Sequence, residues 1–251
     1  MKKILTLKNV FKDFSGLTVL SGITMEIFDG ERHAIIGPNG AGKSTLFNII
    51  SGLYKPSKGN IYFLDKNITG WPIDKITRLG LSRSFQIVNI FPRMTVFENV
   101  RNAVVSRFNR CFNFITLLNR DVEIKKESDR VIDLLGLNDV RNVPASSLSY
   151  GGQRKLELAL ALALDPVLIM LDEPTAGLNT EETRNAMQLI RRLTEGKTLI
   201  IIEHDMEVVF NLADRITVLN QGKSLATGTP NEIQENQEVN EAYLRRTKSA
   251  A

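Results

Sequence analysis

The sequence has little cysteine and no long apolar run. Cys111 is the only cysteine among 251 residues, which excludes an intramolecular disulfide and a thiolate metal cluster and fits a reducing compartment. The longest apolar run, 158–164, is far below the roughly 18 residues that a membrane-spanning helix needs. If the protein works at a membrane, another chain must hold it there.

The charges exclude a strongly basic or acidic protein. The formal net charge is +4, and the basic residues are scattered rather than grouped as in nucleic-acid-binding proteins. Residues 1–3 resemble the start of a signal peptide, but Thr6, Lys8 and Asn9 interrupt any apolar segment behind them. With 43% hydrophobic and 24% charged residues, and with neither an internal repeat nor a low-complexity linker, we expect a soluble globular protein.

Residues 37–45 read Gly-Pro-Asn-Gly-Ala-Gly-Lys-Ser-Thr and match G-x-x-x-x-G-K-[ST], the phosphate-binding loop of nucleoside triphosphatases. A β-rich segment, 32–36, precedes the loop, and an apolar segment at helical spacing, 46–50, follows it. This context disfavours the alternative, a glycine-rich turn that opens an ordinary helix.

The loop residues suit a nucleotide. Glycines let backbone N–H groups converge on an anion, and the helix N-terminus adds to this cradle. Lys43 supplies a charge for the β and γ phosphates, and the Ser44 hydroxyl can ligate Mg²⁺. The predicted binding residues of the loop are Asn39, Gly40, Ala41, Gly42, Lys43, Ser44 and Thr45.

Hydrophobic patterns predict alternating strands and helices, and hence an α/β fold. Strands are expected at 4–10 (as an edge strand), 19–27, 32–36, 60–64, 81–86, 166–171, 198–202, 215–219 and 223–227. Helices are expected from the phosphate loop to Gly52 and at 72–80, 95–108, 117–136, 146–164, 180–193 and 230–247. The runs 166–171 and 198–202 suit central parallel strands, whose carboxyl ends bind ligands in such sheets.

Polar residues follow these two central strands. Asp172 is placed to hold Mg²⁺, and Glu173 is placed to take a proton from the attacking water. Adjacent acids also occur as plain strand-end solvation, but the phosphate loop favours the metal site. His204 can donate a hydrogen bond to the γ-phosphate and orient the water, although a lone histidine at a strand end is more often structural. His33 has no placed partner and is assigned no role.

Three further features allow two interpretations each. Phe14, on an expected turn at 12–16, either stacks on an adenine ring or caps the core of a small sheet. Gln86 either ligates Mg²⁺ or the water and relays the nucleotide state to a partner, or is a surface residue. Residues 107–125, with basic residues and three phenylalanines, form either an exposed helix or loop or a contact surface.

Residues 148–153, Leu-Ser-Tyr-Gly-Gly-Gln, open the apolar helix expected at 146–164. Ser149, Gly151 and the helix N-terminus form a second anion site, more than 100 residues from the phosphate loop. One nucleotide does not need two cradles from one subunit. Two subunits placed head to tail would bring one cradle from each onto every ATP.

Together these motifs resemble the ATP-binding subunit of ABC transporters over essentially the whole chain. The parts that carry the resemblance are 37–45, the Gln86 loop, the signature 148–153, the strand 167–173, the loop 176–179 and His204. Segments 83–86, 91–99, 148–151, 176–179, 228–230 and 242–244 are similar to the branched-chain amino acid subgroup. Tyr150 replaces a glycine, Gly152 stands where glutamine is usual, and Asn179 replaces a frequent aspartate.

The resemblance implies the P-loop NTPase fold of ABC ATPases within a single domain, 1–251. Residues 1–86 and 160–251 would form a mostly parallel sheet core with an N-terminal antiparallel β subdomain, and about 87–159 an inserted α-helical subdomain. It also implies ATP and Mg²⁺, with the γ-phosphate contact best assigned to Ser149 and Gly151.

The partners implied are a second ATPase subunit, in a homodimer or heterodimer, and transmembrane permease subunits. A solute-binding protein would act indirectly, and no nucleic acid is expected. The implied location is the cytoplasmic face of the inner (plasma) membrane, as a peripheral subunit.

The preferred function is therefore ATP hydrolysis that drives the transport of a solute, expected to be a branched-chain or related amino acid. A non-transport ABC ATPase acting on ribosomes or DNA is an alternative, but the second cassette or long coiled-coil insert usual there is missing. A nucleotide-gated scaffold is disfavoured by Glu173 and His204, and a GTPase by the lack of an Asn-Lys-x-Asp stretch. Lipid, urea and aromatic-acid transporters use close relatives, so the sequence leaves the solute open.

Overall fold

The computed structural model of the chain describes residues 2–83, 90–108 and 121–244. The strands are β1 (Lys3–Phe14), β2 (Leu17–Phe28), β3 (Arg32–Ile36), β4 (Lys58–Phe63), β5 (Lys66–Asn67), β6 (Leu81–Arg83), β7 (Leu168–Asp172), β8 (Thr198–Ile202), β9 (Arg215–Asn220) and β10 (Lys223–Gly228). The α-helices are α1 (Lys43–Ile50), α2 (Ile73–Arg78), α3 (Val96–Arg107), α4 (Val122–Leu135), α5 (Tyr150–Ala163), α6 (Thr180–Leu193), α7 (Met206–Leu212), α8 (Pro230–Glu235) and α9 (Gln237–Val239). Short 3₁₀ turns lie at Asn138–Val140 and Ala145–Ser147, and a π-helical turn lies at Asn240–Leu244.

The main sheet has the strand order β10-β9-β3-β8-β7-β6. The pairs from β9 to β6 are parallel, and β10 joins antiparallel to β9 as a hairpin. Leu199 and Ile201 of β8 belong to one buried cluster and Ile200 and Ile202 to the other, so both faces of the strand are covered. This burial on two sides explains why the central strands are uninterrupted apolar runs. The predicted α/β fold with a mostly parallel sheet is confirmed.

The antiparallel sheet near the amino terminus has the order β2-β1-β4-β5. The prediction of an edge strand at 4–10 is wrong, because β1 lies between β2 and β4. An alternating pattern reports that one face is buried, but it does not report how many neighbours a strand has. The turn expected at 12–16 is also shorter, since β1 continues to Phe14 and only Ser15 and Gly16, both with positive φ, connect it to β2.

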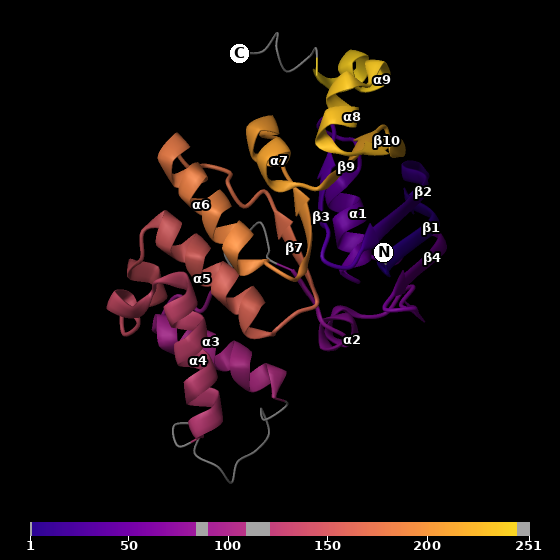
Figure 1. Cartoon of the computed structure of the whole chain (residues 1–251). Coiled ribbons are helices and arrows are strands. Elements are labelled where there is room, and N and C mark those ends of the chain that lie inside the picture. The colour runs from indigo at the N-terminus through magenta and orange to yellow at the C-terminus, as the bar shows by residue number, and fades with distance from the viewer. Residues whose placement is uncertain (1, 84–89, 109–120, 245–251) are drawn as a thin grey trace.

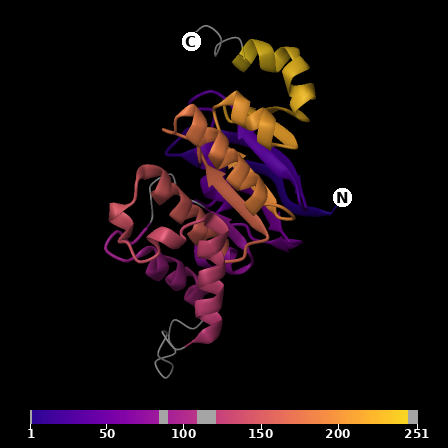
Figure 2. The same ribbon diagram turned by 60° about the vertical axis from the view of Figure 1, so that its left-hand side comes forward.

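The two faces of the main sheet are covered by different elements. Helix α1 packs with the antiparallel sheet on one face, through Leu46 and Phe47 among others. Helices α3 to α7 pack on the opposite face, where α5 contributes Leu156 and Leu162. In both views α3, α4 and α5 form a lobe at one side of the molecule, away from β1 and β2 (Figures 1 and 2). The helix behind the phosphate loop and the helix behind the signature therefore lie on opposite faces of the sheet.

Several helices differ from their predicted extents, and α7 was not predicted. The helix expected at 117–136 begins only at Val122, because Asp121 is its extended N-cap. Helix α5 begins at Tyr150 rather than at residue 146, because Ala145–Ser147 form a 3₁₀ turn and Leu148 is extended. The helix expected at 230–247 is divided at Asn236, which has an extended backbone. The predicted limit of the helical subdomain, residue 159, falls inside α5. None of the helices in the described part of the chain is long and apolar enough to span a membrane.

Candidate active site

The phosphate loop connects β3 to α1 and depends on two glycines. A Cβ on Gly37 would collide with the carbonyl oxygen of Leu219, and a Cβ on Gly42 would come 2.6 Å from Cδ2 of Leu20. Both glycines have positive φ, +152° and +100°. Gly42 caps α1 without a side-chain hydrogen bond, so the first N–H groups of the helix are left for a ligand.

Lys43 lies at the centre of this loop. Its Nζ donates hydrogen bonds to the carbonyl oxygens of Gly37 (2.8 Å) and Pro38 (3.1 Å). Burial lowers the pKa of the Lys43 ammonium, while the carboxylates of Glu173 and Asp172 raise it. The accessibility of the predicted loop residues differs: Asn39, Gly40 and Ser44 are exposed, Lys43 and Thr45 are half-buried, and Ala41 and Gly42 are buried. The loop thus presents a cation and exposed polar groups to solvent, beside two acids.

Those acids stand at the carboxyl end of β7. Asp172 is its last residue and is buried, and Glu173 follows in the left-handed region with φ +47°. Burial raises the pKa of the Asp172 carboxyl, against the effect of the neighbouring Arg83 and Lys43. Its Oδ1 atom is buried and has no hydrogen-bond partner among the described residues. A polar atom in this state suits a cation or a bound water.

The donor set fits Mg²⁺ bound together with phosphate. Within the described ranges, no group of three or more His, Cys, Asp or Glu side chains could hold a metal ion by itself. Mg²⁺ typically takes only one or two protein oxygens and completes its octahedron with phosphate oxygens and water. The Ser44 hydroxyl and Oδ1 of Asp172 are oxygens of this kind.

Glu173 and His204 come together at the ends of β7 and β8. Nδ1 of His204 lies 3.9 Å from Oε1 of Glu173, with 62% and 27% of the two side chains exposed. The backbone N–H of Glu173 donates to the carbonyl oxygen of Ile202 at 2.9 Å, which fixes the two strand ends relative to each other. Both side chains are thus accessible to a ligand held by the phosphate loop.

Two residues of this region carried no predicted role. Arg83, at the end of β6, donates to Oδ2 of Asp172 at 3.3 Å. Glu203, immediately before His204, accepts hydrogen bonds from Thr175. Glu203 could have been found as a carboxylate directly behind a buried strand. Arg83 gives no such signal, because its partner is 89 positions away.

The remaining predicted residues have different surroundings. Phe14 is 38% exposed and meets Tyr54 edge-on, with the ring centroids 5.5 Å apart, so it stands outside the buried core of the small sheet. Gln86 lies outside the described residues, as do 109–120 of the segment 107–125. His33, which had no placed partner, is buried between Oε1 of Glu31 (2.7 Å) and Oγ1 of Thr217 (2.8 Å).

The signature segment starts α5. Ser149 is the exposed N-cap, and its Oγ accepts a hydrogen bond from the N–H of Gly152 at 3.2 Å. A Cβ on Gly151 would meet open space. The Tyr150 hydroxyl donates to the carbonyl oxygen of Ala176 at 3.3 Å, in the loop that follows Glu173.

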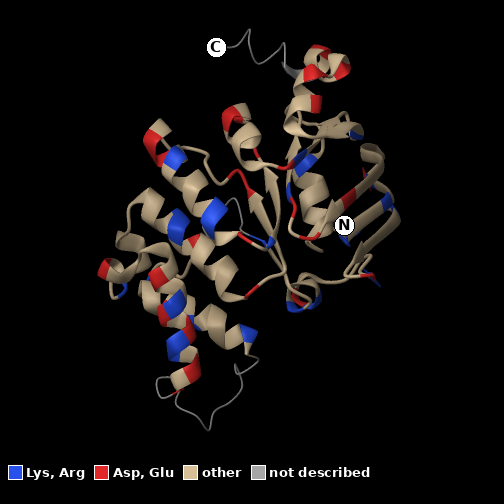
Figure 3. Cartoon of the chain, viewed as in Figure 1, with Lys and Arg blue, Asp and Glu red and all other residues tan. Residues whose placement is uncertain are grey.

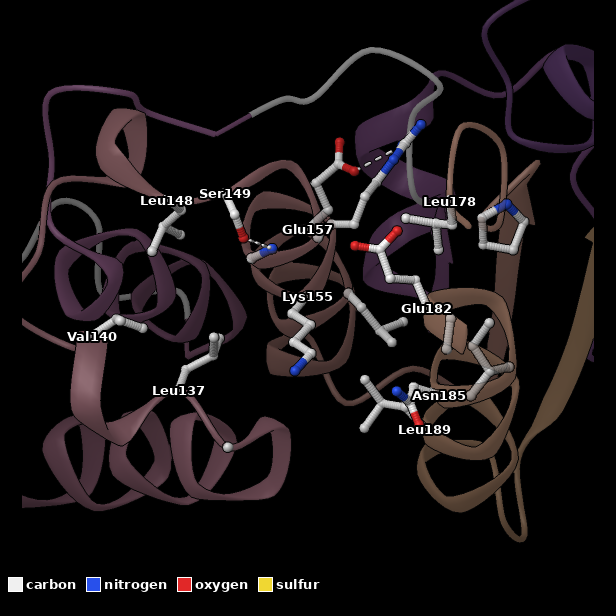
Figure 4. Close-up of a pocket in the computed structure, with 18 of the residues that line it drawn as sticks. Leu137, Val140, Leu148, Ser149, Lys155, Glu157, Leu178, Glu182, Asn185 and Leu189 are labelled. Carbon is white, nitrogen blue, oxygen red and sulfur yellow. Dashed lines mark hydrogen bonds and ion pairs between the residues drawn. The ribbon is translucent and has the colours of Figure 1, made fainter. Parts of the chain in front are cut away.

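A cavity of ≈ 490 Å³ opens between α5 and α6 beside the signature. Figure 4 shows Ser149 and Lys155 of α5 and Asn185 and Leu189 of α6 around it. The start of α5 therefore borders open space and is not packed into the interior.

The family of the chain follows from its sequence. The sequence profile described as "ABC transporter" matches residues 20–176, a stretch that includes the phosphate loop, the signature and Glu173. The chain belongs to the ABC transporter family. The high-affinity branched-chain amino acid transport ATP-binding protein LivG of Escherichia coli K12 is 39% identical over 249 residues, which cover 96% of this chain and 97% of LivG.

Solved structures of ABC transporter cassettes share the fold. The ADP conformation of MJ1267, an ATP-binding cassette of an ABC transporter, matches with a TM-score of 0.85 and 28% identity over 97% of this chain and 99% of that one. A dimeric post-hydrolysis structure of the cassette MJ0796 bound to ADP and Pi matches with a TM-score of 0.77 and 29% identity over 90% and 99%. The predicted family and fold are confirmed, and the chain is an ATPase of the ABC class.

Proposed function

We propose that this chain is the ATP-hydrolysing subunit of a transporter for branched-chain or related amino acids. LivG, a relative named for high-affinity branched-chain amino acid transport, is similar to this chain over nearly its full length. The observation that carries the catalytic part is the convergence of Lys43, Asp172, Glu173 and His204 at the carboxyl ends of parallel strands. In open α/β sheets this edge is where ligands bind.

The proposed reaction assigns each side chain a task. The loop N–H groups and Lys43 hold the β and γ phosphates of ATP, and the exposed Phe14 offers a face to the adenine. Glu173 accepts the proton of the attacking water, and His204 donates a hydrogen bond to the γ-phosphate. Mg²⁺, when bound, neutralises charge that develops on the phosphate oxygens. Ser44, Asp172 and the predicted Gln86 would hold it.

We propose that two such subunits form the working unit. Helices α1 and α5 cover opposite faces of the main sheet, which favours pairing the phosphate loop of one copy with Ser149 and Gly151 of another. Ser149 is exposed and Gly151 adjoins open space, as a contact to a partner's γ-phosphate requires. The solved MJ0796 cassette is dimeric with ADP and Pi bound.

The proposed permease contact involves an exposed aromatic residue ahead of α3. Phe91 is 55% exposed and Met94 is 38% exposed. The buried Asn99 holds this loop: its Oδ1 accepts from the N–H of Phe91 at 2.8 Å, and its Nδ2 donates to the carbonyl oxygens of Phe91 (3.1 Å) and Met94 (3.3 Å). An exposed apolar pair on a rigid loop suits docking to membrane subunits at the cytoplasmic face.

A matched set of variants tests the hydrolytic role. Glu173→Gln removes the base and keeps the volume, so ATP binding should persist while turnover falls by about 10²–10⁴-fold. The ATP-bound dimer should then accumulate in size-exclusion chromatography. Lys43→Ala should lose nucleotide binding, and Glu26→Gln, an exposed carboxylate of β2 paired with Lys3, serves as the control. A monomeric Glu173→Gln protein at saturating ATP would contradict the proposal.

Co-purification tests the transport role. Membrane subunits retained by the unmodified chain and lost with Phe91→Asp, at unchanged ATP binding, would support a transporter. Ribosomes or DNA among the retained partners would support the alternative class. Figure 3 shows Lys and Arg interspersed with Asp and Glu along α4 to α6, rather than a continuous basic run along these helices.

A further inference from the structure

Glu203 is a buried carboxylate that the proposed reaction does not use. It stands directly behind β8, between Ile202 and His204, and its side chain is 0% exposed. Oε1 accepts hydrogen bonds from the backbone N–H of Thr175 at 3.0 Å and from its hydroxyl at 2.6 Å. Oε2 accepts from the backbone N–H of His204 at 3.2 Å. One carboxylate thus joins the two segments that carry the proposed base and the proposed histidine.

The segment held by Glu203 contains a strained turn. Glu173 has φ +47°, a left-handed conformation that is strained for a residue with a Cβ and persists only where its surroundings enforce it. The N–H of Ala176 donates to the carbonyl oxygen of Glu173 at 3.1 Å and closes the turn. Thr175, inside the turn, is 6% exposed, and its hydroxyl donates a hydrogen bond to Oε1 of Glu203. The hydrogen bonds to Glu203 therefore help to enforce the backbone that aims Glu173.

We propose that Glu203 is a positioning residue for ATP hydrolysis, which holds the carboxylate of Glu173 and the imidazole of His204 at their working separation. The inference rests on the proposed roles of these two residues. Nδ1 of His204 and Oε1 of Glu173 are 3.9 Å apart, and the backbone of each segment is bonded to the same carboxylate. Because Glu203 adjoins His204 in the chain, its hydrogen bonds to Thr175 tie the turn behind Glu173 to the backbone of His204, in addition to the bond between the Glu173 N–H and the Ile202 carbonyl oxygen.

This arrangement predicts that loss of the Glu203 contacts affects ATP turnover but not ATP binding. The phosphate loop is carried by β3 and α1, and its Lys43 is held by loop carbonyl oxygens. Glu203 acts on the ends of β7 and β8 instead. Loss of its hydrogen bonds should therefore lower kcat and leave the affinity for ATP almost unchanged.

Glu203→Gln is the first test, because it keeps the volume of the side chain. The glutamine amide has one acceptor oxygen, whereas the carboxylate has two. Its NH₂ group must therefore face either Thr175 or the backbone N–H of His204, and the hydrogen bond on that side is lost. We expect kcat to fall by roughly 10- to 100-fold, since a misplacement of about 1 Å can cost about 10²-fold. KM for ATP and the binding of a fluorescent ATP analogue should change by less than about twofold.

Glu31→Gln is the matched control. Glu31 precedes β3, its side chain is 6% exposed, and it accepts a hydrogen bond from the N–H of Phe28 at 2.8 Å. The substitution perturbs a buried carboxylate outside the site, so kcat and KM should stay unchanged. Urea unfolding of both variants measures the loss of stability that each substitution causes.

Thr175 provides a second test that leaves Glu203 in place. Thr175→Val is isosteric and removes the hydroxyl that donates to Oε1, so kcat should fall in the same direction. Thr175→Ser retains the hydroxyl and should restore turnover. The double variant Thr175→Val/Glu203→Gln should lose less than the product of the two single losses, because both break one hydrogen-bonded unit.

Two results would overturn the positioning role. One is a kcat of Glu203→Gln equal to that of Glu31→Gln; the other is a parallel loss of ATP binding and turnover, which would leave Glu203 a role in folding alone. Glu173→Gln separates this inference from the proposed function. If Glu173→Gln is inactive and Glu203→Gln is unaffected, only the positioning role fails; if Glu173→Gln hydrolyses ATP at the unmodified rate, the proposed function fails.

Discussion

Replacing Arg83 with methionine should strongly destabilise the fold, because it strips a buried carboxylate of its cation. The side chains of Arg83 and Asp172 are 8% and 2% exposed, and Nη2 lies 3.3 Å from Oδ2. Nη1 of Arg83 also donates to Oδ1 of Asn48 (2.6 Å) and Oγ of Ser51 (3.0 Å) on α1. The guanidinium lies 4.8 Å from the ring centroid of Phe47. One side chain thus ties β6, the phosphate-loop helix and the proposed metal ligand together.

The burial of the pair sets the size of the effect. Removing one partner of a buried ion pair typically costs about 3–5 kcal/mol, because the other charge stays buried. For Asp172 the remaining nearby cation would be Lys43, which does not replace the hydrogen bond from Arg83. Arg107 offers a comparison: it pairs with Glu127 at 2.9 Å and with Asp165 at 2.8 Å, but its side chain is 29% exposed and those of its partners are 19% and 46% exposed. Pairs with solvent access contribute about 0–1 kcal/mol. Arg83→Met should therefore lose several times the unfolding free energy that Arg107→Met loses.

Urea unfolding at neutral pH, without nucleotide, measures both losses. The double variant Arg83→Met/Asp172→Asn should be more stable than Arg83→Met, because it also removes the buried charge. Equal losses for Arg83→Met and Arg107→Met would refute the assignment of a buried ion pair. A double variant no more stable than Arg83→Met would show that the cost does not come from Asp172.

Three other changes test single side chains. Burial lowers the pKa of His33 below its ordinary 6.5, so below that pH the unfolded chain binds a proton that the folded chain does not. The contribution of His33 to the unfolding free energy should therefore be complete above about pH 6.5 and fall below it by at most about 1.4 kcal/mol per pH unit. His33→Gln should remove this pH dependence in urea unfolding measured at a series of pH values. Tyr150→Phe removes the hydrogen bond to Ala176, worth about 1 kcal/mol, and should lower kcat up to about fivefold at constant KM in a steady-state ATPase assay. Phe14→Ala removes the proposed adenine platform and should raise KM for ATP roughly tenfold at constant kcat, as fluorescent-analogue binding can check.

The sequence predicted those parts of the site whose signals are local. The phosphate loop is a contiguous pattern whose glycines are required by its own backbone, as the positive φ angles of Gly37 and Gly42 show. The acids at the carboxyl end of β7 and the histidine behind β8 follow short apolar runs, which are typical of central strands buried on both faces. Their proximity then follows from parallel pairing, which brings carboxyl ends to one edge.

The parts that the sequence did not reveal depend on contacts between distant segments. The alternation in β1 is the same for an edge strand and an interior one, so its partners β2 and β4 could not be inferred. Arg83 pairs with Asp172, which lies 89 positions away in the sequence, and Glu203 is hydrogen-bonded to Thr175, which lies 28 positions away. The sequence alone does not show which residue pairs with a given buried charged side chain. For this reason the predicted site contained the residues proposed to touch ATP and lacked those that hold them in place.

Tyr150 occupies a position at which the ABC signature more often has glycine. Its side chain makes contacts that bear on the proposed head-to-tail dimer. Each subunit would touch two nucleotides, its own through Glu173 and its partner's through Ser149. The Tyr150 hydroxyl reaches the carbonyl oxygen of Ala176 at 3.3 Å, and Arg154 donates to the same hydroxyl at 3.0 Å. A glycine could make neither contact. The Tyr150 side chain therefore links the loop behind Glu173 to the first turn of α5 within one subunit.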